Sequence, residues 1–335
     1  MNKKYLGCLL GAAVGDAMGA ATEMRTRAQI LGKFGYVSTF IQAPDDTFAR
    51  GCEIGCVTDD FSIAYDTVQI ILKHQGRIDY EVAKEALIYW GREDNYYLKF
   101  AGPTTKIAVR KLLGEVIPEY HGFKLCNDNG KATNGAAMKI SPISLFSHGD
   151  VEMAINYACM ISVVSHNNDI SISGAGAIAA ATACALQDNV TLDDIVQAGL
   201  YGAKEGERLG RIQGDTLAGP SVRRRIELAV ELGKQVKPLV DIMDDISDII
   251  GTGLAAAEAV PAVFGIIVAC KGDPIKSIQT AVNIGNDTDT IATMVGGILG
   301  ALHGSDAFPI EYLELINKVN HYDLKEMANQ IEALK

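Results

Sequence analysis

The chain has 335 residues, and its 41 acidic and 30 basic side chains give a formal net charge of −11 at pH 7. This excess of negative charge argues against nucleic acid or an anionic membrane surface as the main partner, because both would repel it. The composition, 48% hydrophobic and 21% charged with 34 glycines, is typical of a globular protein whose helices pack closely. Because no linker or low-complexity run marks a boundary, we expect one domain over residues 1–335.

The seven cysteines are odd in number and scattered along the chain, so a disulfide framework is not expected. Cys52 and Cys56 lack the second Cys/His pair that a structural zinc site needs. No run of about 18 or more uncharged apolar residues predicts a membrane span. These features favour a reducing cytoplasm as the location.

The first expected helix follows two lysines and resembles a signal peptide in outline. Every fourth residue of this stretch is a glycine: Gly7, Gly11, Gly15 and Gly19. Such spacing places a smooth stripe along one face of a helix, against which another backbone can pack closely. Asp16 interrupts the apolar run that an export segment would keep, and Glu23 ends it. We therefore expect a buried N-terminal helix.

A first acidic cluster, Thr58-Asp59-Asp60, precedes apolar residues at helical spacing from Phe61 to Leu72. This pattern predicts an amphipathic helix with an acidic first turn. The preceding segment, residues 24–57, is rich in glycine and contains Pro44-Asp45-Asp46. It predicts a long loop region that brings substrate-facing groups over the acidic cluster.

Further helices are expected over residues 80–90 and 102–113. The arginine run 223–225 predicts a solvated helix face. The Ala-rich segment 251–270 predicts another helical region, with Pro261 at a break or in a first turn. Because strand-like alternation is nearly absent, the sequence predicts an all-α fold.

The Ala/Gly-rich segment 173–186 contains a G-x-G-x-x-A pattern that begins at Gly174. A dinucleotide-binding fingerprint requires a hydrophobic strand that runs into the first glycine, whereas His166-Asn167-Asn168-Asp169 lies ahead of this one. We therefore interpret the segment as a buried helix. By itself, His166 is more often a helix-start or core histidine than a ligand-binding one.

A second acidic cluster, Asp287-Thr288-Asp289-Thr290, begins an apolar segment that continues to Gly304. Carboxylates suit the N-terminus of a helix, so the cluster is explained equally by capping. Carboxylate and hydroxyl oxygens are also the ligands that Mg²⁺, Mn²⁺ and Ca²⁺ prefer. If the two acidic helix starts meet in the fold, four carboxylates collect there, and they repel one another unless protons or cations lie between them. A dinuclear metal site then becomes the natural explanation.

Five segments carry a resemblance to a known family: Gly7 to Glu23, Thr58-Asp59-Asp60, Asn134-Gly135-Ala136-Ala137-Met138, Ser165-His166-Asn167-Asn168, and Gly285-Asn286-Asp287-Thr288-Asp289-Thr290-Ile291-Ala292. In this order they closely resemble the ADP-ribosylglycohydrolase family, which includes the enzymes that reactivate ADP-ribosylated dinitrogenase reductase. The resemblance covers roughly residues 5–304. It implies an orthogonal all-α helical bundle with two Mg²⁺ or Mn²⁺ ions in a cleft. It also implies cleavage of the bond between C1″ of ADP-ribose and its acceptor.

The resemblance assigns roles to particular residues. The metal ligands that it implies are Thr58, Asp59, Asp60, Asp287, Asp289 and Thr290. It implies Glu23 and Asp60 as the catalytic residues, with Glu23 near the scissile bond as general acid or base. Asn134, Gly135 and His166 match segments that hold the ADP-ribose. Phe61 departs from the Thr or Ser of many members, which implies an altered wall of the site.

Several functions remain open at this point. The first is a metal-dependent hydrolase of a small or protein-linked ADP-ribosyl conjugate, and the second is an N-ribosidase that acts on a nucleoside-like metabolite. The third is a non-catalytic ligand-binding relative, like the lens-crystallin members of the family, which the intact acidic set and Glu23 disfavour. A phosphohydrolase is the sharpest rival, because two-metal sites also cleave phosphoesters. The motifs leave the acceptor, the choice between Mg²⁺ and Mn²⁺, and the oligomeric state open.

Overall fold

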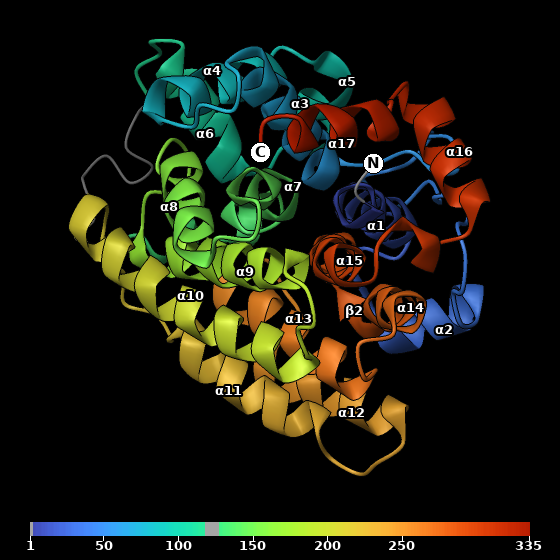
Figure 1. Ribbon diagram of the computed structural model, residues 1–335. Coiled ribbons are helices and arrows are strands. Elements are labelled where there is room, and N and C mark those ends of the chain that lie inside the picture. The colour runs from blue at the N-terminus through green and yellow to red at the C-terminus, as the bar shows by residue number, and fades with distance from the viewer. Residues whose placement is uncertain (1–2, 118–126) are drawn as a thin grey trace.

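A computed structural model describes residues 3–117 and 127–335, and the regular secondary structure in this part of the chain is almost entirely helical (Figure 1). The α-helices are α1 (Lys3–Gly19), α2 (Arg27–Phe34), α3 (Asp59–Lys73), α4 (Tyr80–Trp90), α5 (Asp94–Phe100), α6 (Pro103–Leu112), α7 (Ile140–Ser144), α8 (Val151–Ser162), α9 (Asp169–Leu186), α10 (Leu192–Gln213), α11 (Val222–Gly233), α12 (Leu239–Asp245), α13 (Ala256–Ala269), α14 (Pro274–Ile284), α15 (Thr288–His303), α16 (Ile310–Asn320) and α17 (Leu324–Glu332). Short helical turns are η1 (Asn129–Lys131), η2 (Asn134–Ala136), η3 (Leu145–Ser147), η4 (Ile246–Ile250) and η5 (Ser305–Ala307). The strands are β1 (Arg25–Thr26) and β2 (Gly285–Asn286). The all-α prediction is confirmed.

Helices α1 and α15 lie side by side, and their backbones touch along the predicted glycine stripe (Figure 1). A Cβ atom on Gly11 would stand 2.1 Å from the carbonyl oxygen of Gly296, which is far inside van der Waals contact. A Cβ atom on Gly19 would stand 2.4 Å from the Cα atom of Asp289. The stripe therefore brings the C-terminal end of α1 against the acidic start of α15.

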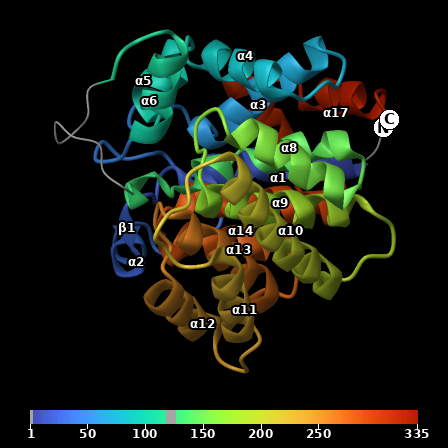
Figure 2. The ribbon, with the colours of Figure 1, turned by 90° about the vertical axis from the view of Figure 1, so that its left-hand side faces the viewer.

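Helix α9 is a core helix rather than a dinucleotide loop. Gly174 and Gly176 lie inside it, and Gly176 packs against the backbone of Gly202 on α10. Among the described residues, α9 is the one helix long and apolar enough to cross a membrane, and 94% of that stretch is buried inside the protein. In Figure 2, α1 and α9 run across the middle of the molecule. Helices α3 and α4 lie above them, and α11 and α12 lie below.

The segment 24–57 is less irregular than the sequence predicted. It contains the strand β1, which pairs antiparallel with β2 in the register Arg25↔Asn286 and Thr26↔Gly285. It also contains the eight-residue helix α2, which starts with a capping box between Thr26 and Gln29. This pairing joins the residues that follow Glu23 to the residues that precede Asp287.

Two predictions around α13 are wrong. Pro261 lies inside α13 rather than at a break or in a first turn. A proline there leaves the carbonyl oxygen four residues earlier, on Ala257, without its helical N–H donor. The guanidinium of Arg225 donates to that oxygen at 3.0 Å and to the carbonyl oxygen of Ile250 at 3.1 Å. The arginine run is therefore not simply solvated, because its third member bridges the two ends of the loop 251–255.

Candidate active site

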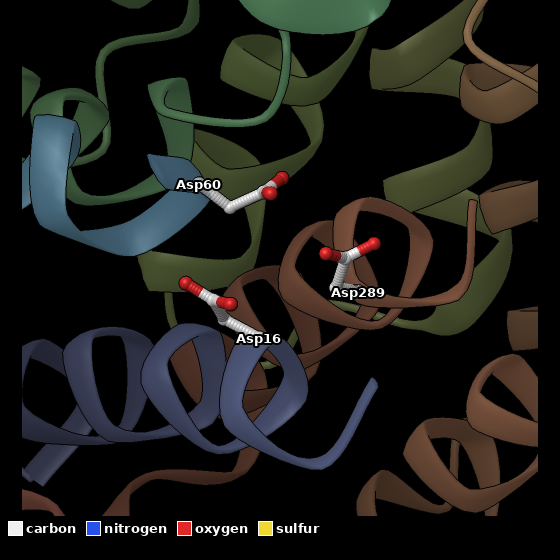
Figure 3. Close-up of side chains that lie close together, drawn as sticks. All are labelled: Asp16, Asp60 and Asp289. Carbon is white, nitrogen blue, oxygen red and sulfur yellow. The ribbon is translucent and has the colours of Figure 1, made fainter. Parts of the chain in front are cut away.

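Three buried aspartates from three helices face one another in the interior. Asp16 comes from α1, Asp60 from α3 and Asp289 from α15, and Figure 3 shows their carboxylates around one space. One oxygen of each lies within 4.8 Å of the other two. Asp60 and Asp289 belong to the predicted site. Asp16 was missed, because the sequence analysis used it only as an argument against a signal peptide.

A second group shares Asp289 with the first. One oxygen each of Glu23, Asp287 and Asp289 again lies within 4.8 Å of the others. Asp289 hydrogen-bonds to Glu23 and to Asp287. Ionised carboxylates only accept hydrogen bonds, so such contacts need a proton, or a cation in its place, between the oxygens. The two acidic helix starts thus meet as predicted, joined through Asp289.

The start of α3 is attached to α1 by Asp16. Its carboxylate accepts hydrogen bonds from the backbone N–H groups of Thr58 and Phe61 at 2.8–3.0 Å, and from the Thr58 hydroxyl at 2.8 Å. These are N–H groups that have no partner within the helix. Thr58 is the N-cap of α3, and its side-chain oxygen accepts a hydrogen bond from the N–H group of Asp60. Asp59, the next predicted ligand, is half-buried beside the cavity and stands outside both carboxylate groups.

The charged forms of these carboxylates are disfavoured in the fold. Burial raises the pKa of Asp16 to about 7, despite its hydrogen bonds to Thr58 and Phe61. Burial, followed by the charge of Asp287, raises the pKa of Glu23 to about 8, and burial, followed by the charge of Asp16, does the same for Asp59. Burial also raises the pKa of Asp60 and of Asp289 well above the usual range. Such carboxylates favour any cation that enters the site.

The arrangement fits hard divalent cations. Both groups offer only carboxylate oxygens, which Mg²⁺ and Mn²⁺ prefer. Within the described residues, Asp60 Oδ1 is buried and has no hydrogen-bond partner. A buried oxygen of this kind needs an explanation, and a metal ion would satisfy it. Thr290 is buried beside it and hydrogen-bonds to Asp60.

A cavity of about 410 Å³ opens over the carboxylates, and the predicted substrate-binding residues line it. Asn134 donates a hydrogen bond to Asp287, so it positions a carboxylate. His166 is buried, and its two ring nitrogens hydrogen-bond to Ser165 at 2.8 Å and to Thr133 at 2.9 Å. Burial, followed by the charge of Lys139, lowers the pKa of His166 to about 3, so the ring is neutral.

The imidazole ring of His166 lies against Gly135. A Cβ atom on Gly135 would stand 2.8 Å from His166 Nε2, so a larger residue would displace the ring. Lys139 is a buried basic side chain near His166 that was not predicted from the sequence. Burial lowers its pKa to about 8. No pattern of spacing marks it, because its position depends on the packing of α7 against α3.

Phe61 does not alter the wall of the cavity. Its ring is fully buried and packs against the rings of Tyr65 and Tyr322, with centroids 6.3 Å and 5.9 Å away. It is absent from the residues that line the cavity, and only its backbone N–H group reaches Asp16. The sequence-based expectation of an altered wall is therefore wrong.

Glu23 lies where two cavities meet. It lines the cavity over the carboxylates and also a second, open cavity of about 470 Å³. The second cavity carries Arg25, Lys33 and Asp46, and Asp46 forms ion pairs with both cations. A group bound over the metal-type site and a group in the second cavity would thus both reach Glu23.

Residues 1–335 match the sequence profile of a family described as ADP-ribosylglycohydrolase. The chain belongs to the ADP-ribosylglycohydrolase family. Within this hydrolase family it is similar to human ADP-ribosylhydrolase ARH3, with 27% identity over 329 residues, 91% of this chain and 87% of that protein. It is 24% identical over 335 residues to ADP-ribosylarginine hydrolase Tri1 of Pseudomonas putida strain GB-1, which covers 98% of this chain and 79% of that protein.

The chain is also 29% identical over 335 residues to the uncharacterized protein YegU of Escherichia coli strain K12, and the match covers 98% of this chain and 96% of that protein. A solved structure titled ADP-ribosylglycohydrolase-related protein complex superimposes with a TM-score of 0.68 at 21% sequence identity. The match covers 99% of this chain and 96% of that chain. It confirms the predicted helical fold of the ADP-ribosylglycohydrolase type.

Proposed function

We propose that this protein is a metal-dependent hydrolase that cleaves the glycosidic bond at C1″ of an ADP-ribosyl group. The proposal rests on two clusters of three acidic residues each, which share Asp289 and lie beneath a cavity that Glu23 also lines. Relatives named as ADP-ribosyl hydrolases support the choice of bond. The acceptor is either a protein side chain or a small molecule.

The residues that would hold two divalent cations, Mg²⁺ or Mn²⁺, are the predicted set Thr58, Asp59, Asp60, Asp287, Asp289 and Thr290, to which we add Asp16. When bound, such ions supply Lewis acidity and neutralise the carboxylates. Asp60 would bind an ion through Oδ1, its oxygen without a hydrogen-bond partner in the described part of the chain. Asn134 keeps Asp287 oriented by its hydrogen bond.

Glu23 would transfer the proton. Burial, the largest cause of its raised pKa, favours a protonated Glu23, which is the state a general acid needs before it protonates a leaving group. Its place between two cavities separates the sugar side from the acceptor side. Gly135 and the neutral His166 would form part of the wall that receives the ADP-ribose, with the histidine ring held by Ser165 and Thr133.

Product analysis tests the proposal. The protein is incubated with Mg²⁺ or Mn²⁺ and with ADP-ribosyl-arginine, ADP-ribosyl-serine peptides or a panel of nucleosides. Release of free ADP-ribose with the diphosphate intact is the expected result. Release of ribose from nucleosides alone would identify an N-ribosidase. Metal-dependent release of phosphate or AMP, with every glycosidic bond intact, would identify a phosphohydrolase and refute the proposal.

The remaining predictions concern surroundings and partners. Six cysteines in the described part of the chain are free thiols, while Cys126 lies outside it. Free thiols are stable in a reducing compartment, so the cytoplasm stays our prediction. The net charge of −11 supports the prediction that neither nucleic acid nor a membrane surface is a partner.

A further inference from the structure

Two cysteines lie in the loop between α2 and α3, and one of them, Cys52, contacts Lys99, which lines the cavity over the carboxylates. Gly51 and Gly55 have positive φ angles of 74° and 91°, which let the chain double back. Cys52 and Cys56 thereby come within hydrogen-bonding distance of each other through their side chains. Both are only partly buried, in contrast to Cys8, which lies fully inside the core.

The ammonium group of Lys99 on α5 contacts the same sulfur. Lys99 Nζ lies 2.9 Å from Cys52 Sγ and donates to the carbonyl oxygen of Arg50 at 2.8 Å. A cation at this distance stabilises the thiolate over the thiol. The Cys56 hydrogen bond, followed by Lys99, lowers the pKa of Cys52 to about 6, although burial opposes them. Cys52 thus has the surroundings of a reactive thiolate, with a second thiol in reach.

We propose that Cys52 and Cys56 form a peroxide-reactive dithiol, in which Cys52 is the nucleophile and Cys56 the resolving thiol. The neighbouring backbone favours this order. Asn320 holds the Cys56 side of the turn, because it accepts from the N–H group of Val57 at 3.0 Å and donates to the carbonyl oxygen of Gly55 at 2.9 Å. The fixed backbone suits Cys56 as the resolving thiol, whereas Lys99 contacts Cys52 and activates it as the nucleophile.

The chemistry balances with hydrogen peroxide as the oxidant. The Cys52 thiolate attacks one peroxide oxygen, so an S–O bond forms, the O–O bond breaks, and the leaving hydroxide takes a proton to become water. The Cys56 sulfur then attacks the sulfenic sulfur of Cys52. The S–S bond forms, the S–O bond breaks, and hydroxide leaves as water with the Cys56 proton. Two thiols are oxidised to a disulfide, and one peroxide is reduced to two waters.

Oxidation would also change the cavity. Lys99 lines the cavity over the carboxylates, and its thiolate partner disappears when the disulfide forms. Oxidation of the two thiols requires no glycohydrolase activity. Its test is therefore independent of the proposed function.

Peptide mass spectrometry of the full-length protein tests the proposal. The reduced protein is treated with hydrogen peroxide, unfolded in a thiol-alkylating reagent and digested with trypsin. Cleavage after Arg50 and Lys73 gives a peptide that contains Cys52 and Cys56 and no other cysteine. We expect this peptide to lose two hydrogens and to take up no alkylating reagent, whereas the Cys8 peptide stays reduced and alkylated.

Variants separate the two roles. Cys56→Ser should accumulate a sulfenic acid on Cys52 that a dicarbonyl probe traps, and Cys52→Ser should leave Cys56 reduced. Lys99→Met should slow oxidation of Cys52 about tenfold, because less of the sulfur is thiolate. Lys99→Arg keeps the cation and should restore the rate. Lys106→Met, at a lysine that lines the same cavity, is the matched control and should react like the unchanged protein.

Three outcomes would overturn the proposal. The first is a peptide that stays reduced at peroxide concentrations that oxidise a free cysteine standard. The second is equal oxidation of Cys8, which would mean non-specific damage. The third is an unchanged rate in Lys99→Met, which would show that the ammonium group does not activate the sulfur.

Discussion

Glu23 and Asp289 belong to the same cluster of three acidic residues, yet the proposed chemistry gives them different roles. Glu23 is half-buried at the junction of two cavities, where a leaving group can reach it. Asp289 is buried and is shared by both carboxylate groups. The first position suits proton transfer, and the second suits cation binding, so conservative substitutions should separate the two.

Glu23→Gln should keep the fold and lower turnover. An amide cannot transfer the proton, and general acid–base groups typically contribute about 10² to 10⁴ in rate. Turnover of an ADP-ribosyl substrate at saturating Mg²⁺ is the measurement, and Glu311→Gln, at an exposed glutamate on α16, is the control. Near-normal turnover of Glu23→Gln would mean that Glu23 only ends the N-terminal helical segment.

Asp289→Asn should abolish most of the thermal stabilisation by Mg²⁺ or Mn²⁺. Ligand at 100 times its Kd stabilises a fold by about 2.7 kcal/mol, and this gain depends on the site that Asp289 shares. The metal-free variant should also melt higher than the unchanged metal-free protein, because an amide has neither the buried charge nor the proton uptake that destabilises the fold at Asp289. Melting curves with EDTA and with metal measure both effects, and Asp241→Asn is an exposed control. An unchanged metal titration in both Asp59→Asn and Asp289→Asn would refute the metal assignment.

At the scale of elements, the contact between α1 and α15 positions the site. Gly11→Ala places a methyl group 2.1 Å from the Gly296 carbonyl oxygen, so the helices must separate. Overpacking of this kind costs about 1–3 kcal/mol. Gly32→Ala on α2 is the control, because nothing lies within 4 Å of its new Cβ atom, and it should be neutral or stabilising. Denaturant unfolding measures the difference, and equal stability of the two variants would contradict the close approach.

The Arg225 bridge should matter to the site from a distance. Arg225→Met leaves the carbonyl oxygens of Ile250 and Ala257 without this donor, and each unsatisfied buried oxygen costs about 1–3 kcal/mol. The loop between them supplies the Thr252 carbonyl oxygen that holds the Asp287 N–H group at 2.9 Å. We therefore expect a lower melting temperature and weaker Mg²⁺ stabilisation.

Arg224→Met is the matched control for the Arg225 bridge. Arg224 is exposed and forms an ion pair with Glu227 at 3.0 Å, and exposed ion pairs contribute about 0–1 kcal/mol. If both arginine variants melt alike, the bridge to the loop has no role in stability.

At the scale of the whole molecule, the metal-free protein should lose stability as the pH rises. The folded-state pKa values of Asp16, Glu23 and Asp59 are raised to about 7 or 8, so the folded protein binds more protons than the unfolded chain above pH ~4. Stability therefore falls as the pH rises from there through about 8. Melting temperatures in EDTA from pH 5 to 9 should decline, and saturating Mg²⁺ should flatten or reverse the trend. A metal-free melting temperature that rises with pH would contradict the buried carboxylate cluster.

The whole chain is predicted to fold as a single domain. Helix α1 from the start of the chain packs on α15 near its end, and a contiguous set of buried apolar residues runs from Tyr5 to Ile331. We expect one cooperative thermal transition of the full chain. Two stable proteolytic halves would show instead that the chain folds as two units.

Local patterns in the sequence were sufficient for several of the helices and for two acidic helix starts. Helical spacing predicted α3, and the four-residue glycine repeat predicted the close packing of α1, because both signals lie within one helix. Motif resemblance supplied Glu23 and the metal-ligand set, which stay predictions. By contrast, α2 was missed, since its capping box is short and lies in a segment rich in turn residues.

Only the tertiary structure decided which of these groups meet. Asp16 joins the site because α1 crosses the start of α3, a contact between residues 42 positions apart. Phe61 does not line the cavity because its ring packs against Tyr322, near the other end of the chain. Arg225 turns inward because Pro261 on another helix leaves a carbonyl oxygen to satisfy. Periodicity and spacing report the face on which a side chain lies, whereas its partner is chosen by the packing of elements distant in sequence.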